Sequence, residues 1–159
     1  MFVRESAAVY TEHNMTGFHD LIDLQAGQPA AVVFDFERVW DYYIRHKPDT
    51  INFVHVHPTG FGPGYSQQDL SCMRGFRGAF GKKQRWKFLI VCFQNDEPGD
   101  LRCQILEHLI EQESNAVTSF RPVRPIPIDI LKALKLLSYG DVNNESLDRA
   151  ALEPIEKID

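Results

Sequence analysis

Cysteine is scarce in this sequence, and its pattern excludes the structures that cysteines usually build. The chain has three cysteines, Cys72, Cys92 and Cys103, and no C-x-x-C pair among its 159 residues. An odd, widely spaced set argues against a disulfide framework. We therefore expect a reducing, cytoplasmic location.

Long apolar runs and an excess of positive charge are also missing. No segment approaches 18 unbroken apolar residues, so we expect no membrane span. Residues 1–5 lack the basic-then-apolar pattern of a signal peptide. The net charge of −5 argues against nucleic-acid binding. The sequence has 43% hydrophobic and 25% charged residues, which is the composition of an ordinary globular protein.

Hydrophobic periodicity predicts an α/β domain with a mixed central β-sheet flanked by helices. The expected strands are 4–10, 20–24, 30–36, 51–57, 86–94 and 101–109, with an extended edge segment at 125–127. The expected helices are 37–46, 66–79 and 128–137. Residues 1–140 form a single domain, and the polar tail 141–159 has room for a short helix at 146–157.

One predicted strand carries two histidines on the same face. Side chains alternate along residues 51–57, so His55 and His57 point the same way as Phe53, away from Val54 and Val56. Two imidazoles at the end of a strand can bind one metal ion. An H-x-H pair alone is more often two hydrogen-bonded or half-exposed histidines, so the interpretation needs support from its surroundings.

The segment after His57 gives that support. A loop rich in glycine and proline, Pro58–Tyr65, returns the chain to a helix that begins with Ser66 and carries Asp69 one turn later. This S-x-x-D also fits a plain helix capping box. Taken with the two histidines, however, Asp69 gives three protein ligands and an open fourth position, which is typical of one catalytic zinc ion per chain. Cys72 as a fourth ligand would close the site, and we do not expect it.

The full pattern resembles the motif of the JAMM (MPN+/JAB) zinc metalloproteases. The residues are His55-Val56-His57-Pro58, seven further residues, and Ser66-Gln67-Gln68-Asp69. The strand Phe88–Cys92 is also similar to that family, and the likeness runs from about residue 4 to 110, nearest to small prokaryotic members. It implies a JAB/MPN (cytidine deaminase-like) fold. It also implies hydrolysis of the bond after the C-terminal glycine of a ubiquitin-like or sulfur-carrier protein.

The resemblance further implies a catalytic glutamate before the motif. Glu5, Glu12 and Glu37 are the candidates, and the small, apolar run after Glu5 favours that residue. Glu12 would lie near a turn, and Glu37 would open a helix, where a carboxylate suits the helix dipole anyway. Glu5 then acts as general base and afterwards as acid, and the Ser66 hydroxyl helps to hold the oxyanion.

Two departures from the family pattern concern the loop and the start of the chain. The loop before Ser66 is one residue longer than usual, and only four residues precede Glu5, where the family has an N-terminal helix. Another segment, 128–137 or 146–157, would have to cover the apolar face of the first strand. An uncovered face would predict a partner or a homodimer.

The expected substrate is the extended tail of a ubiquitin-like protein, bound against a sheet edge. Phe61, Gly62 and Tyr65 are candidate walls of its channel, with a flexible loop and incidental aromatic residues as the alternative. Two other functions stay open: a non-catalytic MPN scaffold, and a zinc peptidase with no ubiquitin-like substrate. The four histidines outside the motif are isolated in sequence and are expected at the surface.

Overall fold

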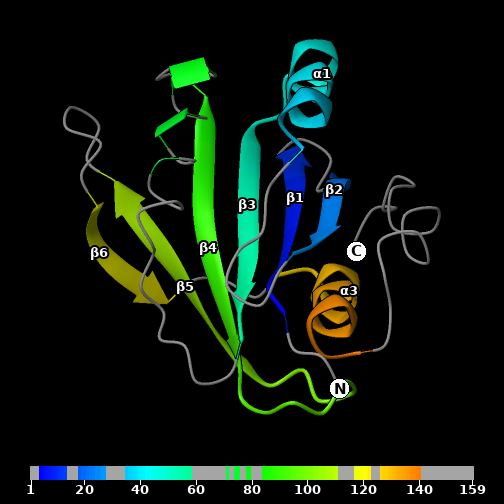
Figure 1. Cartoon of the computed structure of the whole chain (residues 1–159). Helices are drawn as coiled ribbons and strands as arrows, with labels where there is room; N and C mark the ends of the chain where they lie inside the picture. Colours follow the sequence, from blue (N-terminus) through cyan, green and yellow to red (C-terminus); the bar gives the residue numbers. More distant parts are fainter. Residues whose placement is uncertain are drawn as a thin grey trace.

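Six strands form one mixed sheet in the order β2-β1-β3-β4-β5-β6 (Figure 1). The structure is a computed structural model, and it describes residues 4–13, 18–27, 35–58, 71, 74–75, 78–79, 84–110, 117–122 and 126–140. The strands are β1 (Ser6–His13), β2 (Phe18–Ala26), β3 (Thr50–His57), β4 (Arg85–Phe93), β5 (Cys103–Ile110) and β6 (Val117–Pro122). The helices are α1 (Phe36–His46) and α3 (Ile128–Tyr139). Only β3 and β4 run parallel among these neighbours, so the α/β class with a mixed sheet is confirmed.

Most predicted elements lie close to their predicted bounds. The first two strands pair as an antiparallel hairpin, and β4 pairs with β5 as expected. Helix α1 begins where the Asp35 side chain accepts a hydrogen bond from the backbone N–H of Arg38, at 3.2 Å. It ends before Lys47, which adopts φ 43° and donates its N–H to the Tyr43 carbonyl at 3.0 Å. Pro48 follows, where a helix could not continue.

The bounds of one predicted strand are wrong at its end, and one edge strand was not predicted. The predicted strand 30–36 cannot include its last two residues, because Asp35 caps α1 and Phe36 is the first helical residue. Residues 28–34 lie outside the described residues, so the rest of that strand stays a prediction. Residues 126 and 127 of the predicted edge segment 125–127 are not in a strand, and Pro127 is the N-cap of α3. The edge strand is β6 at Val117–Pro122, which was not predicted. The prolines at 125 and 127 were a stronger local signal than the short run of residues 117–120.

The described residues of the predicted helix 66–79 are helical. They are Ser71, Arg74, Gly75, Gly78 and Ala79, and all are exposed. The predicted helix 128–137 is confirmed as α3, which is two residues longer. No described helix has the length and apolar character needed to cross a membrane. The tail 141–159, with its predicted short helix, lies outside the described residues.

Alternation along the strands creates an apolar core on each side of the sheet. The core on one side packs under α3 and includes Ala8, Tyr10, Val54, Val56, Leu134 and Leu137. The core on the other side packs near α1 and includes Val9, Val39, Ile51, Phe53 and Phe88. Helix α3, one of the two segments predicted for this role, therefore covers one face of the first strand. That face is covered within the chain, so it no longer gives a reason to expect a homodimer.

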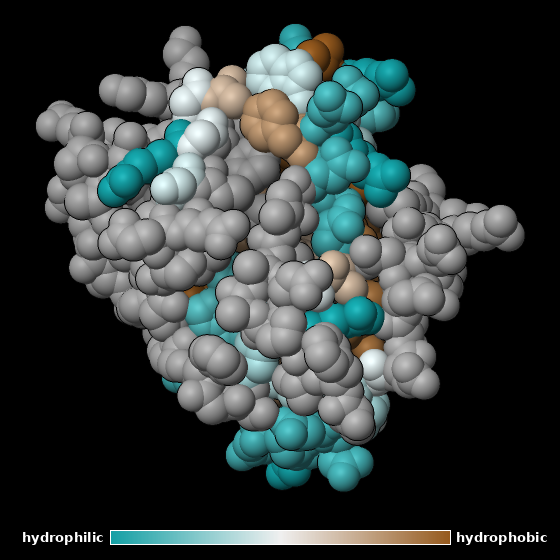
Figure 2. All heavy atoms as spheres, viewed as in Figure 1, coloured by the Kyte–Doolittle hydropathy of each residue, from teal (hydrophilic) through white to brown (hydrophobic). Residues whose placement is uncertain are grey.

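The two ends of the sheet differ in surface character. Apolar and aromatic side chains gather at the end where α1 lies, whereas the turn between β4 and β5 at the opposite end is hydrophilic (Figure 2). On α1, Phe36 is 42% exposed and Ile44 52% exposed, although the helix buries Val39. Scattered exposure of this kind is normal on a globular surface.

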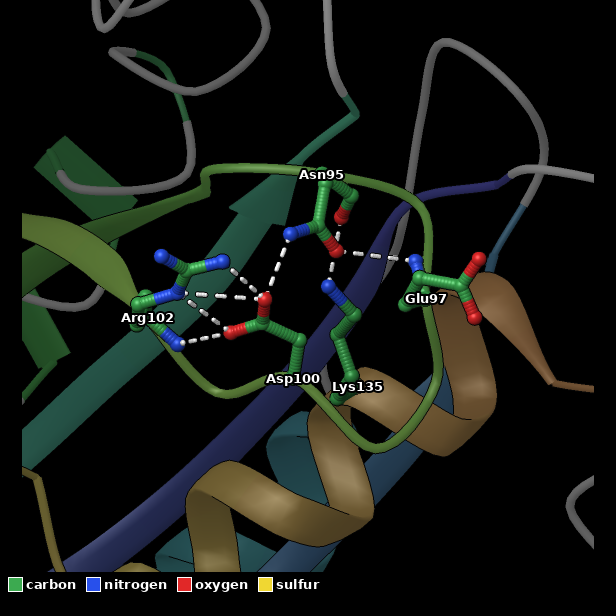
Figure 3. Close-up of polar contacts among 5 residues, drawn as sticks. All are labelled: Asn95, Glu97, Asp100, Arg102 and Lys135. Atoms are coloured by element: carbon green, nitrogen blue, oxygen red, sulfur yellow. Dashed lines mark hydrogen bonds and ion pairs between the residues drawn. The ribbon is translucent and has the colours of Figure 1, made fainter.

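The hydrophilic turn between β4 and β5 is attached to α3 by a buried lysine. The ammonium of Lys135 donates to the backbone carbonyl of Asn95 at 2.5 Å and lies 4.3 Å and 4.6 Å from the ring centroids of Phe93 and Tyr139. Within the turn, Asp100 accepts hydrogen bonds from Asn95 and from the guanidinium of Arg102 (Figure 3). This network holds the pKa of Asp100 well below its usual range, chiefly through Arg102.

Candidate metal centre

Strand β3 presents His55 and His57 to the same point on one face of the sheet. Their Nε2 atoms are 2.8 Å apart, and their ring centroids are 4.6 Å apart. Both side chains are buried, with 4% and 8% of their surfaces exposed. Val54 and Val56 lie in the core on the other face, which confirms the predicted alternation. Two imidazoles that meet nitrogen to nitrogen in a buried place are arranged as a pair of metal ligands would be.

Glu5 joins the two histidines from the residue just before β1. The antiparallel register pairs Ser6 with Val56, so the next pair outward brings Glu5 opposite His57. A carboxylate oxygen of Glu5 lies 3.9 Å from the Nε2 atom of His57, and Glu5 is 6% exposed. Possible ligand atoms of Glu5, His55 and His57 all lie within 4.8 Å of one another. This buried cluster could hold a metal ion.

The other two glutamates considered from the sequence lie elsewhere. Glu12 is part of β1 rather than beyond it, and it pairs with Thr50 at the opposite end of the strand. His57 lies seven positions after Thr50 on the same strand, which is about 23 Å at ~3.3 Å per residue. Glu37 is exposed in the first turn of α1, as predicted. Of the three candidates, Glu5 is the one that the fold brings to the histidines.

The donor set fits a borderline metal such as zinc. Two imidazole nitrogens and a carboxylate oxygen are all ligand types that zinc accepts, and zinc–nitrogen bonds of about 2.0–2.1 Å place two tetrahedral ligands about 3.3 Å apart. The Nε2 atoms stand at 2.8 Å, so a small outward rotation of either ring would reach that spacing. A pair of neutral imidazoles at that distance can share only one N–H between the two nitrogens. The arrangement therefore suits an ion better than it suits an apolar core.

Several predicted site residues lie outside the described part of the chain. These are the third predicted ligand, the predicted oxyanion donor, the three channel residues and the cysteine considered as a fourth ligand: Asp69, Ser66, Phe61, Gly62, Tyr65 and Cys72. Their placement stays a prediction. Of the predicted catalytic and metal-binding residues, the structure brings together Glu5, His55 and His57.

Two further side chains on the face of the sheet that carries the cluster were not predicted from the sequence. Cys92 pairs with His57 across the parallel β3–β4 ladder and shares its face, and burial raises the pKa of this half-buried thiol.

Asp23 on β2 lies on the same face, opposite Val9, and is fully buried. Its carboxylate accepts hydrogen bonds from the side chain of Gln25 and the backbone N–H of Asp35, both at 2.8 Å. Burial nevertheless raises the pKa of Asp23, and its contacts fix the start of α1.

One histidine outside the motif is not isolated. The Nε2 atom of His13 lies 3.0 Å from the hydroxyl of Tyr42 and 4.0 Å from a carboxylate oxygen of Asp20, and Tyr42 also donates to Asp20. Burial and the hydrogen bond to Asp20 raise the pKa of Tyr42 to about 12. The contact joins the β1–β2 hairpin to α1, at the opposite end of β1 from Glu5. No local sequence signal links these residues, because they meet only when the hairpin and the helix pack together.

Comparisons of the chain with protein-family models, with curated proteins and with solved structures give no match. The case for a function therefore rests on the residues and on the geometry described above.

Proposed function

We propose that this protein is a zinc-dependent metallo-isopeptidase or peptidase of the JAMM/MPN+ type with a JAB/MPN fold. It hydrolyses the bond after the C-terminal glycine of a ubiquitin-like or sulfur-carrier protein. The observation that carries the proposal is the position of Glu5 against His55 and His57. An H-x-H pair alone does not require a carboxylate distant in sequence to lie beside it, whereas metal-dependent hydrolysis needs a base at that place.

The zinc would be held by His55, His57 and Asp69. Once bound, the ion would supply a Lewis acid for the scissile carbonyl and would lower the pKa of a water molecule towards about 7. The two histidines bring neutral nitrogen ligands and the aspartate one negative charge. This leaves a net positive centre beside Glu5, which favours the ionised form of its carboxylate.

Glu5 would move the proton. Its carboxylate accepts a proton from the attacking water as the new carbon–oxygen bond forms, and it then donates that proton to the departing amine nitrogen as the carbon–nitrogen bond breaks. Such acid–base catalysis typically contributes about 10²–10⁴-fold in rate. The Ser66 hydroxyl would donate a hydrogen bond to the oxyanion between these two steps.

The burial of the cluster favours a substrate with a small residue at the cleaved bond. His55, His57 and Glu5 expose between 4% and 8% of their surfaces, so a bulky side chain would have little room there. Glycine has no side chain, and an extended tail can lie along a groove through its backbone hydrogen bonds. Phe61, Gly62 and Tyr65 are the proposed walls of that groove.

The first experiment measures zinc content and cleavage in the wild type and in Glu5→Gln, with Glu12→Gln as the matched control. Both variants replace a glutamate near an end of the same short strand pair, but Glu12 lies at the end remote from the histidines. Substrates are fusions of ubiquitin-like and sulfur-carrier proteins whose C-terminal glycine precedes a reporter. We expect one zinc ion per chain in all three proteins, chelator-sensitive cleavage by the wild type and by Glu12→Gln, and a loss of about 10²–10⁴-fold in kcat for Glu5→Gln.

Each alternative function has its own outcome in this experiment. A wild type that binds no zinc would overturn the proposal altogether. Zinc without cleavage of any fusion or peptide would favour a non-catalytic scaffold. Cleavage of general peptides but of no glycine-terminated fusion would favour a zinc peptidase with a different substrate. Full activity in Glu5→Gln would show that another group is the base.

A further inference from the structure

The chain on both sides of Glu5 is tied to the last turns of α3. The Ser6 hydroxyl donates to the backbone carbonyl of Leu134 at 3.0 Å and lies 2.7 Å from the Ser138 hydroxyl. Both serines are fully buried. Because the Ser6 proton is used on the Leu134 carbonyl, the Ser138 hydroxyl is the donor in the contact between the serines. These contacts join β1 to α3 beside the candidate base (Figure 1).

Arg4 makes the second half of the attachment. Its backbone N–H donates to the Ser138 carbonyl at 3.2 Å, and its Nε donates to the Leu137 carbonyl at 2.7 Å. The last four carbonyls of a helix have no partner within the helix, and the negative end of the helix dipole lies there. A cationic side chain and a backbone N–H from Arg4 therefore suit this helix end in both hydrogen bonding and charge.

The attachment matters for Glu5 because that residue lies just before the first residue of β1. The β1–β3 ladder begins at Ser6, and the Glu5 carbonyl accepts one further hydrogen bond from the N–H of Gly27, at 2.8 Å. Side chains alternate, so Ser6 points towards α3 while Glu5 points to the histidines. Strand ends open easily when nothing holds them. The four contacts with α3 fix the backbone on either side of Glu5.

We propose that Ser138, acting through Ser6, is a positioning residue for Glu5, so that α3 sets the distance between the base and the two histidines. This rests on the proposed function, in which Glu5 moves a proton. A displacement of about 1 Å at a reacting group can cost about 10²-fold in rate. Ser138 touches neither the histidines' site nor the substrate, so its effect would fall on kcat, with zinc affinity and KM unchanged.

The test compares Ser138→Ala with Ser138→Thr, which keeps the hydroxyl, and with Lys135→Met. Lys135 lies on the same helix but contacts the β4–β5 turn, so its replacement perturbs α3 without touching the attachment at Glu5. We expect Ser138→Ala to lower kcat about tenfold at unchanged KM and zinc content. Ser138→Thr should restore kcat, and Lys135→Met should leave it unchanged.

A double-mutant cycle tests whether the effect of Ser138→Ala on kcat depends on Ser6. Ser6→Ala removes both of its contacts with α3, so the double variant Ser6→Ala/Ser138→Ala should be no slower than Ser6→Ala alone. Amide hydrogen exchange in the zinc-free protein gives a second measure. The Gly27 amide, which is bonded to the Glu5 carbonyl, should exchange faster in Ser138→Ala than in the wild type, with the global unfolding free energy taken into account.

The outcomes separate this proposal from the proposed function. An inactive wild type would overturn the function itself. An active wild type with kcat unchanged in Ser138→Ala would overturn only the positioning role, whether or not Gly27 exchange rises. Slower turnover that Ser138→Thr does not restore, or an equal loss in Lys135→Met, would point to general destabilisation of α3 and would also overturn it.

Discussion

The two faces of the β1–β3 pair are made by the same alternation of side chains, yet one is an apolar core and the other ends in a polar cluster. Under α3, Ala8, Val54 and Val56 continue the core along the pair. On the other face, Val9 and Phe53 pack near α1, but the positions beyond them towards the end of β3 include Glu5, His55 and His57.

This difference shows how a buried polar cluster can be recognised as a site. Polar groups on the α3 face have conventional hydrogen bonds, such as those of Ser6 with α3 and of Lys135 with Asn95. The Nε2 atoms of the two histidines instead face one another beside a carboxylate. Possible ligand atoms of three residues that converge in one buried place could together hold a metal ion. The comparison predicts that neighbouring residues on opposite faces will affect different properties.

The largest expected contrast is between His57→Ala and Val56→Ala. His57→Ala should weaken zinc binding by more than about 100-fold, since even partners outside the ligand shell can cost 10–100-fold. Val56→Ala removes two buried carbon groups and should lower the free energy of unfolding by roughly 1.6 kcal/mol at ~0.8 kcal/mol each, with zinc affinity unchanged. Zinc titration measures the zinc affinity of each variant, and urea unfolding of the zinc-free proteins measures the free energy of unfolding. Equal loss of zinc affinity in the two variants would contradict the division between the faces.

The second expected effect is on stability alone, where α3 covers the core. Leu134 is fully buried, and Leu134→Ala should lower the free energy of unfolding by about 2–5 kcal/mol. The variant keeps the backbone carbonyl that accepts from Ser6, so the kcat of the folded protein should stay near that of the wild type. Ile44→Ala, on the exposed side of α1, serves as the control and should change stability by less than about 0.5 kcal/mol. Thermal or urea unfolding measures the stability of both variants. A Leu134→Ala protein as stable as Ile44→Ala would mean that packing of α3 on the core contributes little to stability.

The sequence predicted the elements whose signals are local. The alternation in residues 51–57 placed His55 and His57 on one face, and Pro48 marked the end of α1 correctly. The choice of Glu5 over Glu12 and Glu37 came from the family resemblance, and the fold brings that residue to the histidines. Local pattern was sufficient for the shared face of the histidines and for the end of α1, because each depends on residues a few positions apart. Glu5 is distant from the histidines in sequence, so its choice needed the family resemblance.

Features that depend on distant residues could not be predicted in the same way. The contacts of Arg4 and Ser6 with α3 join opposite ends of the chain, and serine has no pattern that marks such a partner. His13 was expected to be isolated, but it meets Tyr42 only after the hairpin packs on α1. Edge strand β6 was misplaced because prolines are a stronger local signal than a short β-branched run.

The smallest expected effect concerns the buried charge on the α3 face. Burial lowers the pKa of Lys135 from its usual 10.5, although the carboxylates of Asp100, Asp96 and Glu97 oppose that shift. Between the lowered value and 10.5, the unfolded chain holds the proton that the folded chain has released, so the free energy of unfolding rises with pH. Below that window both states are charged, and the cost of burying the ammonium is present in full.

Lys135→Met removes this titration while filling a similar volume. The stability of the wild type relative to Lys135→Met should therefore increase as the pH rises from 7 to 10.5, as measured by urea unfolding of the zinc-free proteins at each pH. Tyr10 and Tyr42, whose pKa values burial raises, are present in both proteins, and their contributions cancel in the difference. The difference in the free energy of unfolding between the wild type and Lys135→Met could instead stay constant or fall as the pH rises. This result would mean that the Asn95 carbonyl and the rings of Phe93 and Tyr139 stabilise the ammonium enough to offset its burial.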